Sequence, residues 1–400
     1  MKTLRARFVL PVGSPPIENG AVRVEGSRIV EVGPWRDLGG TAEDLGDVVL
    51  MPGLINAHCH LDYTGMRNAI LFSGKFSHWV RRLNELKRTQ TDDEYLQAIA
   101  EGFNELKKWG TTSVYNIESF PELMVRMPIP PIRTWWFYEL LDIRHRIHTE
   151  DFVAGALAFF EDHQSWQGGF GLSPHAPYTT SLELYELIRF CCEKYSMPVM
   201  THLSETQEEF EMFAQSKGPL YDFLAPLGRD MADTGGTTPL RHLLQNNSLP
   251  HGAILTHMNV LAEDDWELLR TRLDFSIVHC PNCHAYFERP AFPMARFRES
   301  GLNLCLGTDS LASNKALNLF EEMRTVRENF PEVSPEAVLD MVTRNAARAI
   351  GQAGQLGEIA PGALADLIAI PCDSRDVITS VIENRREISW MMISGKTQST

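Results

Sequence analysis

The chain is 400 residues long, which is enough for one large α/β domain together with a smaller one. Its hydrophobic content of 44% is ordinary for a globular protein, and no run approaches the roughly 18 to 20 apolar residues of a membrane span. The formal net charge of −15 argues against a nucleic-acid partner, because such partners usually require a basic face. We therefore expect a protein that binds neither membranes nor nucleic acids.

The N-terminus and the cysteines indicate the compartment. The stretch MKTLRARFVLPVG contains only a short apolar run and no small-residue cleavage site, so we expect no signal peptide. The seven cysteines are odd in number and include the adjacent pair Cys191 and Cys192, which is typical of free thiols rather than of a disulfide framework. We expect a cytoplasmic protein, assembled as a homodimer.

Short β-like runs occupy both ends of the chain. The first 50 residues contain AVRVEG, RIVEVG and DVVLMPG, and the C-terminal end contains ADLIAIP and ISWMMISGK. Chain termini often lie close together, so the two ends can pair. We expect residues 1–52 and 359–400 to form one small β-sandwich domain, and residues 53–358 to form the catalytic domain.

Helices and strands alternate through the middle of the chain. Thr91 and Glu94 form a capping-box pattern, and the helix that follows should end at Gly110. A second helix should run from Ser334 to Gly351, and the stretch from about 215 to 250 reads as a loop-rich insertion. Strands are predicted at residues 111–117, 198–202, 252–257, 275–280 and 302–309, most of them followed by a helical pattern.

This alternation predicts an α/β fold with a parallel sheet. Several of the strands end in His or Asp just before a loop, and both barrels and doubly wound sheets place their chemistry at such ends. The number of strands that end this way favours a (β/α)8 barrel of the TIM type.

The stretch INAHCH, residues 55 to 60, raises the possibility of a metal site. In a strand the side chains alternate between faces, so His58 and His60 point the same way and Cys59 points into the packing on the other side. Two imidazoles at that spacing can share one ion. Further candidates follow at other strand ends: His202, Glu205, His257 and Asp309. Each has a structural explanation when taken alone, but a metal site needs ligands that converge from several strands.

Together, PGLINAHCH, HLSE, LTH and GTDS resemble the amidohydrolase superfamily, and most closely its mononuclear deaminase and chlorohydrolase group. The resemblance covers nearly the whole chain. It implies a single divalent metal ion, Zn²⁺ or Fe²⁺, bound by His58, His60, His202 and Asp309. It further implies that Glu205 is the proton shuttle and that His257 contacts the water or the substrate.

The chemistry is consistent with these residue types. A bound metal lowers the pKa of water toward roughly 7, so that hydroxide is available to attack the amine-bearing carbon of a heterocycle. Glu205 can carry a proton to a ring nitrogen, and Asp309 can orient the water and pass a proton to the leaving ammonia. Binuclear members of the superfamily use a lysine on the fourth strand. The predicted fourth strand, GFGLSPHAPYT, has none, which favours one metal.

Substrate contacts are predicted from three segments. The motif HAPYT resembles a segment that contacts substrate in the group, which singles out His175. The loop HCPNCH supplies His284, and FSHWVRRLNELKR supplies Trp79 as a stacking surface in a helix that could cover the site. His145 and His148 are expected at the rim.

Three alternatives stay open. Cys280 and Cys283 could be half of a structural zinc site or a redox pair. A binding protein could keep a metal for structure alone and would not need Glu205. The runs HCPNCHAYF and GTDSLASN look most like aminodeoxyfutalosine deaminases, which makes aminodeoxyfutalosine the candidate substrate, whereas a triazine-type chlorohydrolase, or another amidohydrolase of cyclic C–N bonds, is the rival.

Overall fold

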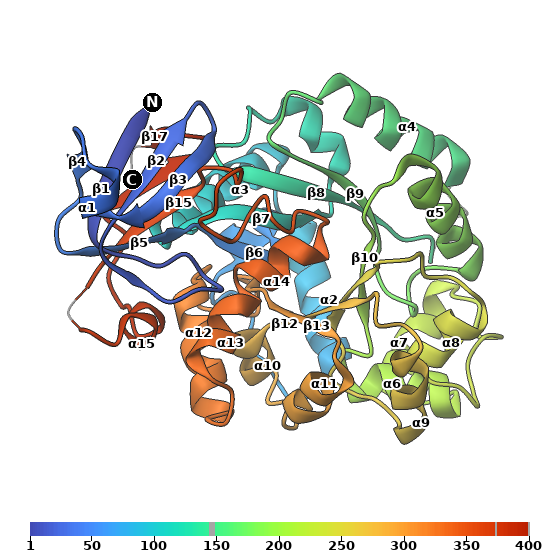
Figure 1. The fold of residues 1–400 in the computed structure, drawn as a ribbon. Helices are drawn as coiled ribbons and strands as arrows, with labels where there is room; N and C mark the ends of the chain where they lie inside the picture. Colours follow the sequence, from blue (N-terminus) through green and yellow to red (C-terminus); the bar gives the residue numbers. More distant parts are fainter. Residues whose placement is uncertain (144–148, 373, 399–400) are drawn as a thin grey trace.

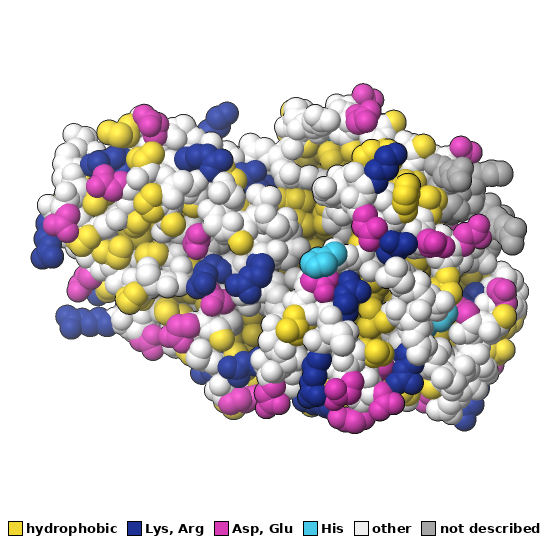
Figure 2. Space-filling model, turned by 45° about the vertical axis from the view of Figure 1, so that its right-hand side comes forward, with side chains coloured by type: hydrophobic (Ala, Val, Ile, Leu, Met, Phe, Trp, Pro, Cys, Tyr) yellow, Lys and Arg dark blue, Asp and Glu magenta, His cyan; other side chains and the backbone are white. Residues whose placement is uncertain are grey.

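The computed structural model describes residues 1–143, 149–372 and 374–398 (Figure 1). His145 and His148 therefore lie outside the described residues. Within the described part of the chain, no helix is both long and apolar enough to cross a membrane. On the face of the molecule in Figure 2, acidic and basic side chains are interspersed.

Strands from both ends of the chain pair in one mixed sheet of eight strands. Strand β15 runs antiparallel to β5, and Lys2 Nζ donates to Thr397 Oγ1 at 3.0 Å, so the termini lie side by side (Figure 1). The strands are β1 (Lys2–Val9), β2 (Ile17–Glu25), β3 (Arg28–Pro34), β4 (Glu43–Asp44), β5 (Val48–Pro52), β15 (Leu367–Pro371), β16 (Trp390–Ile393) and β17 (Lys396–Gln398).

The middle of the chain forms parallel strands in two sheets, ordered β14-β6-β7-β8-β9 and β10-β11-β12-β13. A parallel bridge from Leu172 to Val199 joins the sheets at one margin, and at the other the Thr308 N–H donates to the His58 carbonyl at 3.1 Å. The strands are β6 (Leu54–His60), β7 (Thr111–Glu118), β8 (Arg133–Leu140), β9 (Gly168–Pro174), β10 (Met200–Leu203), β11 (Ile254–His257), β12 (Ser276–His279), β13 (Asn303–Leu306) and β14 (Asp309–Ser310).

Helices follow most of these strands. The capping box at Thr91 is confirmed, since its side chain accepts from the Glu94 N–H while Glu94 accepts from the Thr91 N–H. The helices are α1 (Trp35–Leu38), α2 (Phe76–Lys87), α3 (Asp92–Lys108), α4 (Thr149–Asp162), α5 (Leu182–Tyr195), α6 (Gln207–Gln215), α7 (Pro219–Leu224), α8 (Pro239–Gln245), α9 (Glu263–Arg270), α10 (Pro281–Tyr286), α11 (Met294–Ser300), α12 (Leu319–Asn329), α13 (Pro335–Met341), α14 (Arg344–Ala349) and α15 (Val377–Ile382), with 3₁₀ turns at Leu61–Met66, Pro121–Arg126 and Ala225–Leu227.

One prediction about a helix was wrong. The expected helix from Ser334 to Gly351 is two helices, α13 and α14, because the Val342 carbonyl accepts from the Ile55 N–H of β6 and Thr343 leaves the helical conformation at φ −136° and ψ −99°. The loop-rich insertion at 215–250 also contains two short helices, α7 and α8, and each begins with a proline in its first turn.

The predicted strand at 302–309 is interrupted. Strand β13 ends at Leu306, and Gly307 then passes so close to β6 that a Cβ on it would lie 2.7 Å from the His58 Cβ. Only a glycine fits this approach. The chain resumes pairing at Asp309, in β14, against Cys59 of β6.

Strand β6 carries an irregularity beside the histidines. Its pairing with β7 moves from Asn56–Val114 to Cys59–Asn116, so β6 advances three residues while β7 advances two. This extra residue is a β-bulge, a feature that re-aims side chains beside functional sites. Beyond the bulge, Cys59 is fully buried in the apolar cluster that contains Leu106 of α3.

A buried ion pair connects the terminal sheet to the parallel strands. Arg133, at the start of β8, donates through Nε to Asp366 Oδ2 at 2.9 Å and through Nη2 to Ser394 Oγ at 2.8 Å. The Asp366 carboxylate also accepts from the Ser394 N–H at 2.7 Å. The Arg133 and Asp366 side chains are 10% and 3% exposed, so neither charge is compensated by water if its partner is lost.

We expect Asp366→Ala to lower the free energy of unfolding by about 3 to 5 kcal/mol, because it leaves the Arg133 charge buried and unpaired. Glu43→Ala is the control, because Glu43 pairs with Lys2 at the surface and such pairs contribute about 1 kcal/mol or less. Urea denaturation of both variants measures the difference. Equal, small losses in the two variants would show that the buried pair does not hold the two sheets together.

Candidate functional site

A pocket of about 620 Å³ opens at the carboxyl ends of the parallel strands. Its floor is polar and includes the terminal residues of two strands, His60 of β6 and His257 of β11. Its outer wall is mostly apolar and comes from helix α2 and from the α7 region. Ligand sites of parallel α/β folds lie at this edge of the strands.

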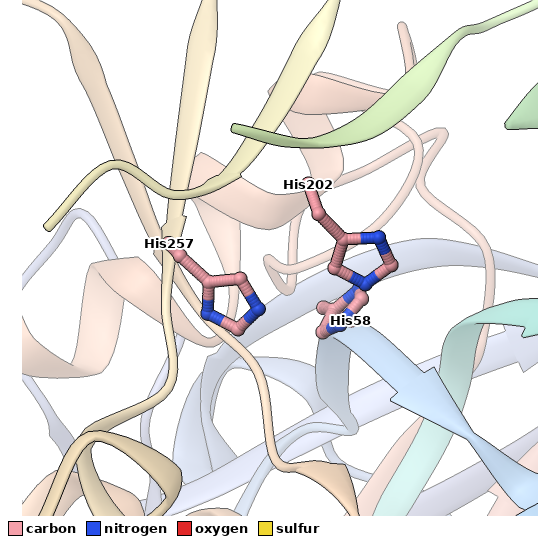
Figure 3. Close-up of side chains that lie close together, drawn as sticks. All are labelled: His58, His202 and His257. Atoms are coloured by element: carbon pink, nitrogen blue, oxygen red, sulfur yellow. The ribbon is translucent and has the colours of Figure 1, made fainter. Parts of the chain in front are cut away.

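Three buried histidines lie close together beside this pocket, and two of them, His202 and His257, line it (Figure 3). The ring of His58 lies 5.1 Å from that of His202 and 5.7 Å from that of His257, and the rings of His202 and His257 stack at 5.5 Å. One nitrogen of each lies within 4.8 Å of the others. His202 and His257 follow His58 by 144 and 199 positions in the sequence. The three rings are nevertheless close enough to share one ion.

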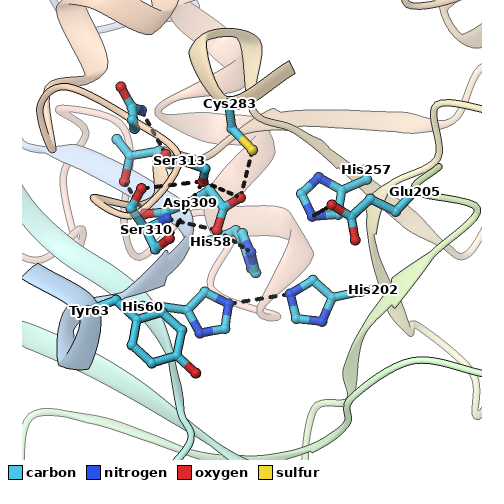
Figure 4. A network of polar contacts seen from close by, with 12 residues as sticks. His58, His60, Tyr63, His202, Glu205, His257, Cys283, Asp309, Ser310 and Ser313 are labelled. Atoms are coloured by element: carbon cyan, nitrogen blue, oxygen red, sulfur yellow. Dashed lines mark hydrogen bonds and ion pairs between the residues drawn. The ribbon is translucent and has the colours of Figure 1, made fainter. Parts of the chain in front are cut away.

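His60 and Asp309 extend the same cluster (Figure 4). His60 Nε2 faces His202 Nε2 at 3.3 Å, and His58 Nε2 lies 3.7 Å from Asp309 Oδ1. His58, His60 and Asp309 form a second group whose potential ligand atoms lie within 4.8 Å of one another. The sequence prediction named all of these side chains, and the structure brings them together.

The histidines are in the form that binds metals. His202 Nδ1 lies 2.9 Å from the His175 carbonyl, to which it can only donate, so Nε2 keeps its lone pair for a ligand. Burial lowers the pKa of His58 and holds those of His60 and His257 well below the ordinary value. Neutral imidazoles beside a carboxylate are a donor set that suits a divalent transition metal.

Asp309 is fixed from several directions. Its Oδ1 accepts from the Ser310 N–H at 2.7 Å, and its Oδ2 accepts from Cys283 Sγ at 2.7 Å and Ser313 Oγ at 3.2 Å (Figure 4). Burial opposes ionisation, but the neighbouring rings of His58, His257 and His60 outweigh it and hold the pKa of Asp309 well below its usual value. The carboxylate form is therefore the one present at neutral pH.

The cysteines of HCPNCH do not form a metal site of their own. Cys283 donates to Asp309, and neither it nor Cys280 joins any group of potential metal ligands among the described residues. Burial raises the pKa of both thiols well above the ordinary value, which opposes the thiolate form that metals and redox chemistry require.

Glu205 lies beside His257 at the wall of the pocket. It follows β10 by two residues, is 5% exposed, and its Oε1 lies 3.7 Å from His257 Nε2. His257 has a φ of 79°, a strained conformation for a residue other than glycine, and such outliers cluster at functional sites. Both side chains line the pocket.

Two of the three predicted substrate contacts line the pocket. His175 Nδ1 pairs with Thr179 Oγ1 at 2.6 Å, and burial lowers the pKa of its ring to about 4. Trp79 of α2 packs against Phe287 at 5.0 Å with its ring at the pocket wall. His284 is not in the lining, and its ring nitrogens contact Asn259 Oδ1 at 3.1 Å and the Pro290 carbonyl at 2.7 Å.

Sequence reasoning missed Glu139 and Arg289. Glu139 lies near the end of β8, lines the pocket, and forms a third potential ligand group with His175 and His202. Burial opposes its ionisation, yet the electrostatic interactions with His175, His60 and Lys87 lower the pKa of Glu139 to about 2. The sequence did offer a signal for Glu139, because this carboxylate stands near the end of the β-like run RTWWFYEL, where site residues are expected. Arg289 pairs with Glu205 across 84 positions, and no local pattern indicates that contact.

The sequence of the chain is similar to sequences of known proteins over most of its length. The sequence profile described as "Amidohydrolase family" matches residues 49–397. The 5-methylthioadenosine/S-adenosylhomocysteine deaminase of Saccharophagus degradans is 27% identical over 385 residues, which cover 91% of this chain and 82% of that protein. The aminodeoxyfutalosine deaminase of Deinococcus radiodurans is 27% identical over 323 residues, covering 78% of this chain and 75% of its own length.

A solved structure shares the fold. An adenosine deaminase from Xanthomonas campestris with bound zinc superposes with a TM-score of 0.84, at 23% identity, and covers 99% of this chain and 92% of that one. At that level of identity the likeness concerns the fold alone. The family match spans most of the chain and therefore shows the family. The chain belongs to the amidohydrolase family and is a hydrolase that acts on carbon–nitrogen bonds.

Proposed function

We propose that this protein is a metal-dependent deaminase of an amino-substituted heterocycle, and specifically of an adenosine derivative. The observation that carries the proposal is the convergence of four imidazoles and one carboxylate on a buried floor, with Glu205 at its edge. The names of the relatives support the reaction type, since the two described above are deaminases.

In this proposal one divalent ion, with zinc favoured over iron, is held by His58, His60, His202 and Asp309. The buried His58 Nε2 has no hydrogen-bond partner among the described residues, and an uncompensated nitrogen 3.7 Å from Asp309 Oδ1 fits a missing ligand. Strand β9 ends without a lysine, which supports one ion rather than two. A divalent ion bound here lowers the pKa of water and supplies the nucleophile at neutral pH.

The protein side chains then have distinct tasks. Glu205 takes up a proton from the water and delivers it to a ring nitrogen of the substrate. His257, which is neutral and 3.7 Å from Glu205, donates a hydrogen bond toward the developing charge. Asp309 orients the water and passes a proton to the departing ammonia, and its three hydrogen bonds fix it for that task.

The pocket supports a substrate with a substituent beyond its amino-bearing ring. The polar floor suits the ring, with His175 and Trp79 as contacts, and the apolar outer wall suits a further group. The wall residues are Phe76, Val80, Leu83, Leu220, Phe223, Leu224 and Leu227. A nucleoside derivative has this division, and aminodeoxyfutalosine is our candidate, with triazine-type chlorohydrolysis as the rival reaction.

The domain arrangement is part of the proposal. We infer a closed (β/α)8 barrel over residues 53–358 and a β-sandwich domain from residues 1–52 and 359–400. The contacts at both margins of the two parallel sheets support the barrel, and the pairing of β5 with β15 supports the composite domain.

Metal content tests the ligand assignment. We expect about one zinc or iron ion per chain in the wild-type protein, and loss of the ion in His58→Ala and His60→Ala. Cys59→Ala should keep it, because Cys59 packs on the opposite face of β6. Emission spectroscopy on the purified proteins measures the stoichiometry. Two tightly bound ions, or loss of metal in Cys59→Ala alone, would refute the assignment.

Ammonia and chloride release test the reaction. We expect ammonia from at least one compound in a panel of aminodeoxyfutalosine, 5-methylthioadenosine, S-adenosylhomocysteine, guanine and cytosine, and no chloride from chlorotriazines. Chloride release alone would favour the rival.

Glu205→Gln keeps the shape of the side chain but cannot carry a proton. Its kcat should fall by at least about 10²-fold with metal content near that of the wild type. If the variant keeps full kcat, the proton role is wrong, and if it loses its metal, Glu205 is a ligand.

A further inference from the structure

Glu205 is held by groups from three other parts of the chain. Its N–H donates to Glu209 Oε2 at 2.6 Å, and its carbonyl accepts from Asn259 Nδ2 at 3.0 Å. Its side chain accepts from Arg289 Nη2 at 2.5 Å. The backbone is thus fixed by α6 and by the loop after β11, and the carboxylate is fixed by a separate segment that follows α10.

Arg289 lies behind the pocket wall. Its side chain is only 7% exposed and is not in the pocket lining, and the guanidinium sits over the ring of Phe287 at 4.5 Å. Phe287 itself lines the pocket and packs against Trp79. Arg289 therefore lies outside the pocket lining, and its hydrogen bond to the site is the one to Glu205.

The contact is made by one carboxylate oxygen. Oε1 of Glu205 accepts from Arg289 Nη2 and also lies 3.7 Å from His257 Nε2. The other terminal nitrogen of the guanidinium, Nη1, has no partner among the described residues, and the contact with Glu205 is the hydrogen bond from Nη2. The second oxygen, Oε2, takes no part in either contact and remains available for a proton.

The positive charge of Arg289 and the negative charge of Glu205 compensate each other in a buried environment. Burial opposes the charge of Arg289, but the Glu205 carboxylate raises the pKa of the guanidinium above its ordinary value. Burial raises the pKa of Glu209 to about 8, so Glu209 is largely neutral at pH 7 and does not compete for Arg289. Breaking such a pair leaves an uncompensated buried charge.

The segment from 280 to 290 also holds Asp309, the other carboxylate of the proposed mechanism. Cys283 of this segment donates to Asp309 at 2.7 Å, and the His284 ring contacts Asn259, which in turn holds the Glu205 carbonyl. The HCPNCH stretch thus contacts the Asp309 carboxylate directly and the Glu205 backbone through Asn259.

We propose that Arg289 is the positioning residue of Glu205, which it anchors through Oε1 so that Oε2 is presented to the reacting atoms. This inference rests on the proton role proposed for Glu205. A carboxylate that lost this anchor would still lie in the pocket but would sample other rotamers, and a misplacement of about 1 Å can cost about 10²-fold in rate.

Three variants test the proposal with 5-methylthioadenosine as the probe. We expect Arg289→Met to keep its metal and to lose about 10- to 100-fold in kcat, with a smaller change in KM. The acid limb of its kcat/KM profile should move to higher pH, because a buried carboxylate without a cationic partner takes up a proton more readily. Arg289→Lys should restore part of the rate. Arg296→Met is the matched control, since Arg296 pairs with Glu263 at the surface and should leave the kinetics unchanged.

A double-mutant cycle separates positioning from a general loss of structure. In a Glu205→Gln background, Arg289→Met should cause little further loss, because Arg289 acts through Glu205 alone. Additive losses, loss of metal in Arg289→Met, or an unchanged kcat and pH profile would each overturn the proposal.

A crystal structure of Arg289→Met gives a readout that does not depend on turnover. We expect the Glu205 carboxylate to have moved away from His257. A carboxylate still at the wild-type position would refute positioning by Arg289, whatever the substrate is. Failure of the proton role proposed for Glu205 is recognised separately, because Glu205→Gln alone would then keep full activity, and failure of the deaminase function is recognised by a wild-type protein that releases no ammonia.

Discussion

The site depends on one constraint, which is that unpaired imidazole nitrogens and a carboxylate must face each other in a space from which water is largely excluded. His60 Nε2 and His202 Nε2, for example, face each other at 3.3 Å. Burial keeps His60 neutral, and the carbonyl of His175 fixes the proton of His202 on Nδ1, so His202 Nε2 presents a lone pair. This arrangement costs free energy without an ion and is stabilised by one, which links the fold to the chemistry.

The parallel strands provide the precision for that arrangement. The donors arrive from β6, β10, β11 and β14, and each lies at or near the end of its strand, where the backbone is fixed by neighbouring strands. Local irregularities then adjust the side chains. The bulge in β6, Gly307 against His58, and the positive φ of Asp309 and His257 all lie within this small region. Irregular backbone is concentrated where the donors must converge.

Much of the site could be read from the sequence, because its residues stand at strand ends and strand ends are recognisable. His58, His60, His202, His257 and Asp309 were found in this way, and Cys59 was correctly assigned to the opposite face. What escaped prediction depends on contacts between distant segments. Arg289 meets Glu205 only because α10 folds back behind the pocket, and the division between α13 and α14 depends on a hydrogen bond from β6. Patterns within one segment carry no information about such partners.

The central claim is that one ion lies between His58, His60, His202 and Asp309 and that Glu205 acts beside it. Anomalous diffraction at the zinc edge, from crystals of the zinc-loaded protein, tests it most directly. The account predicts a single strong peak among these four side chains, with Glu205 outside bonding distance of it. A peak between Cys280 and Cys283, a second peak of equal strength at Glu139 and His175, or a peak bonded to Glu205 would contradict it.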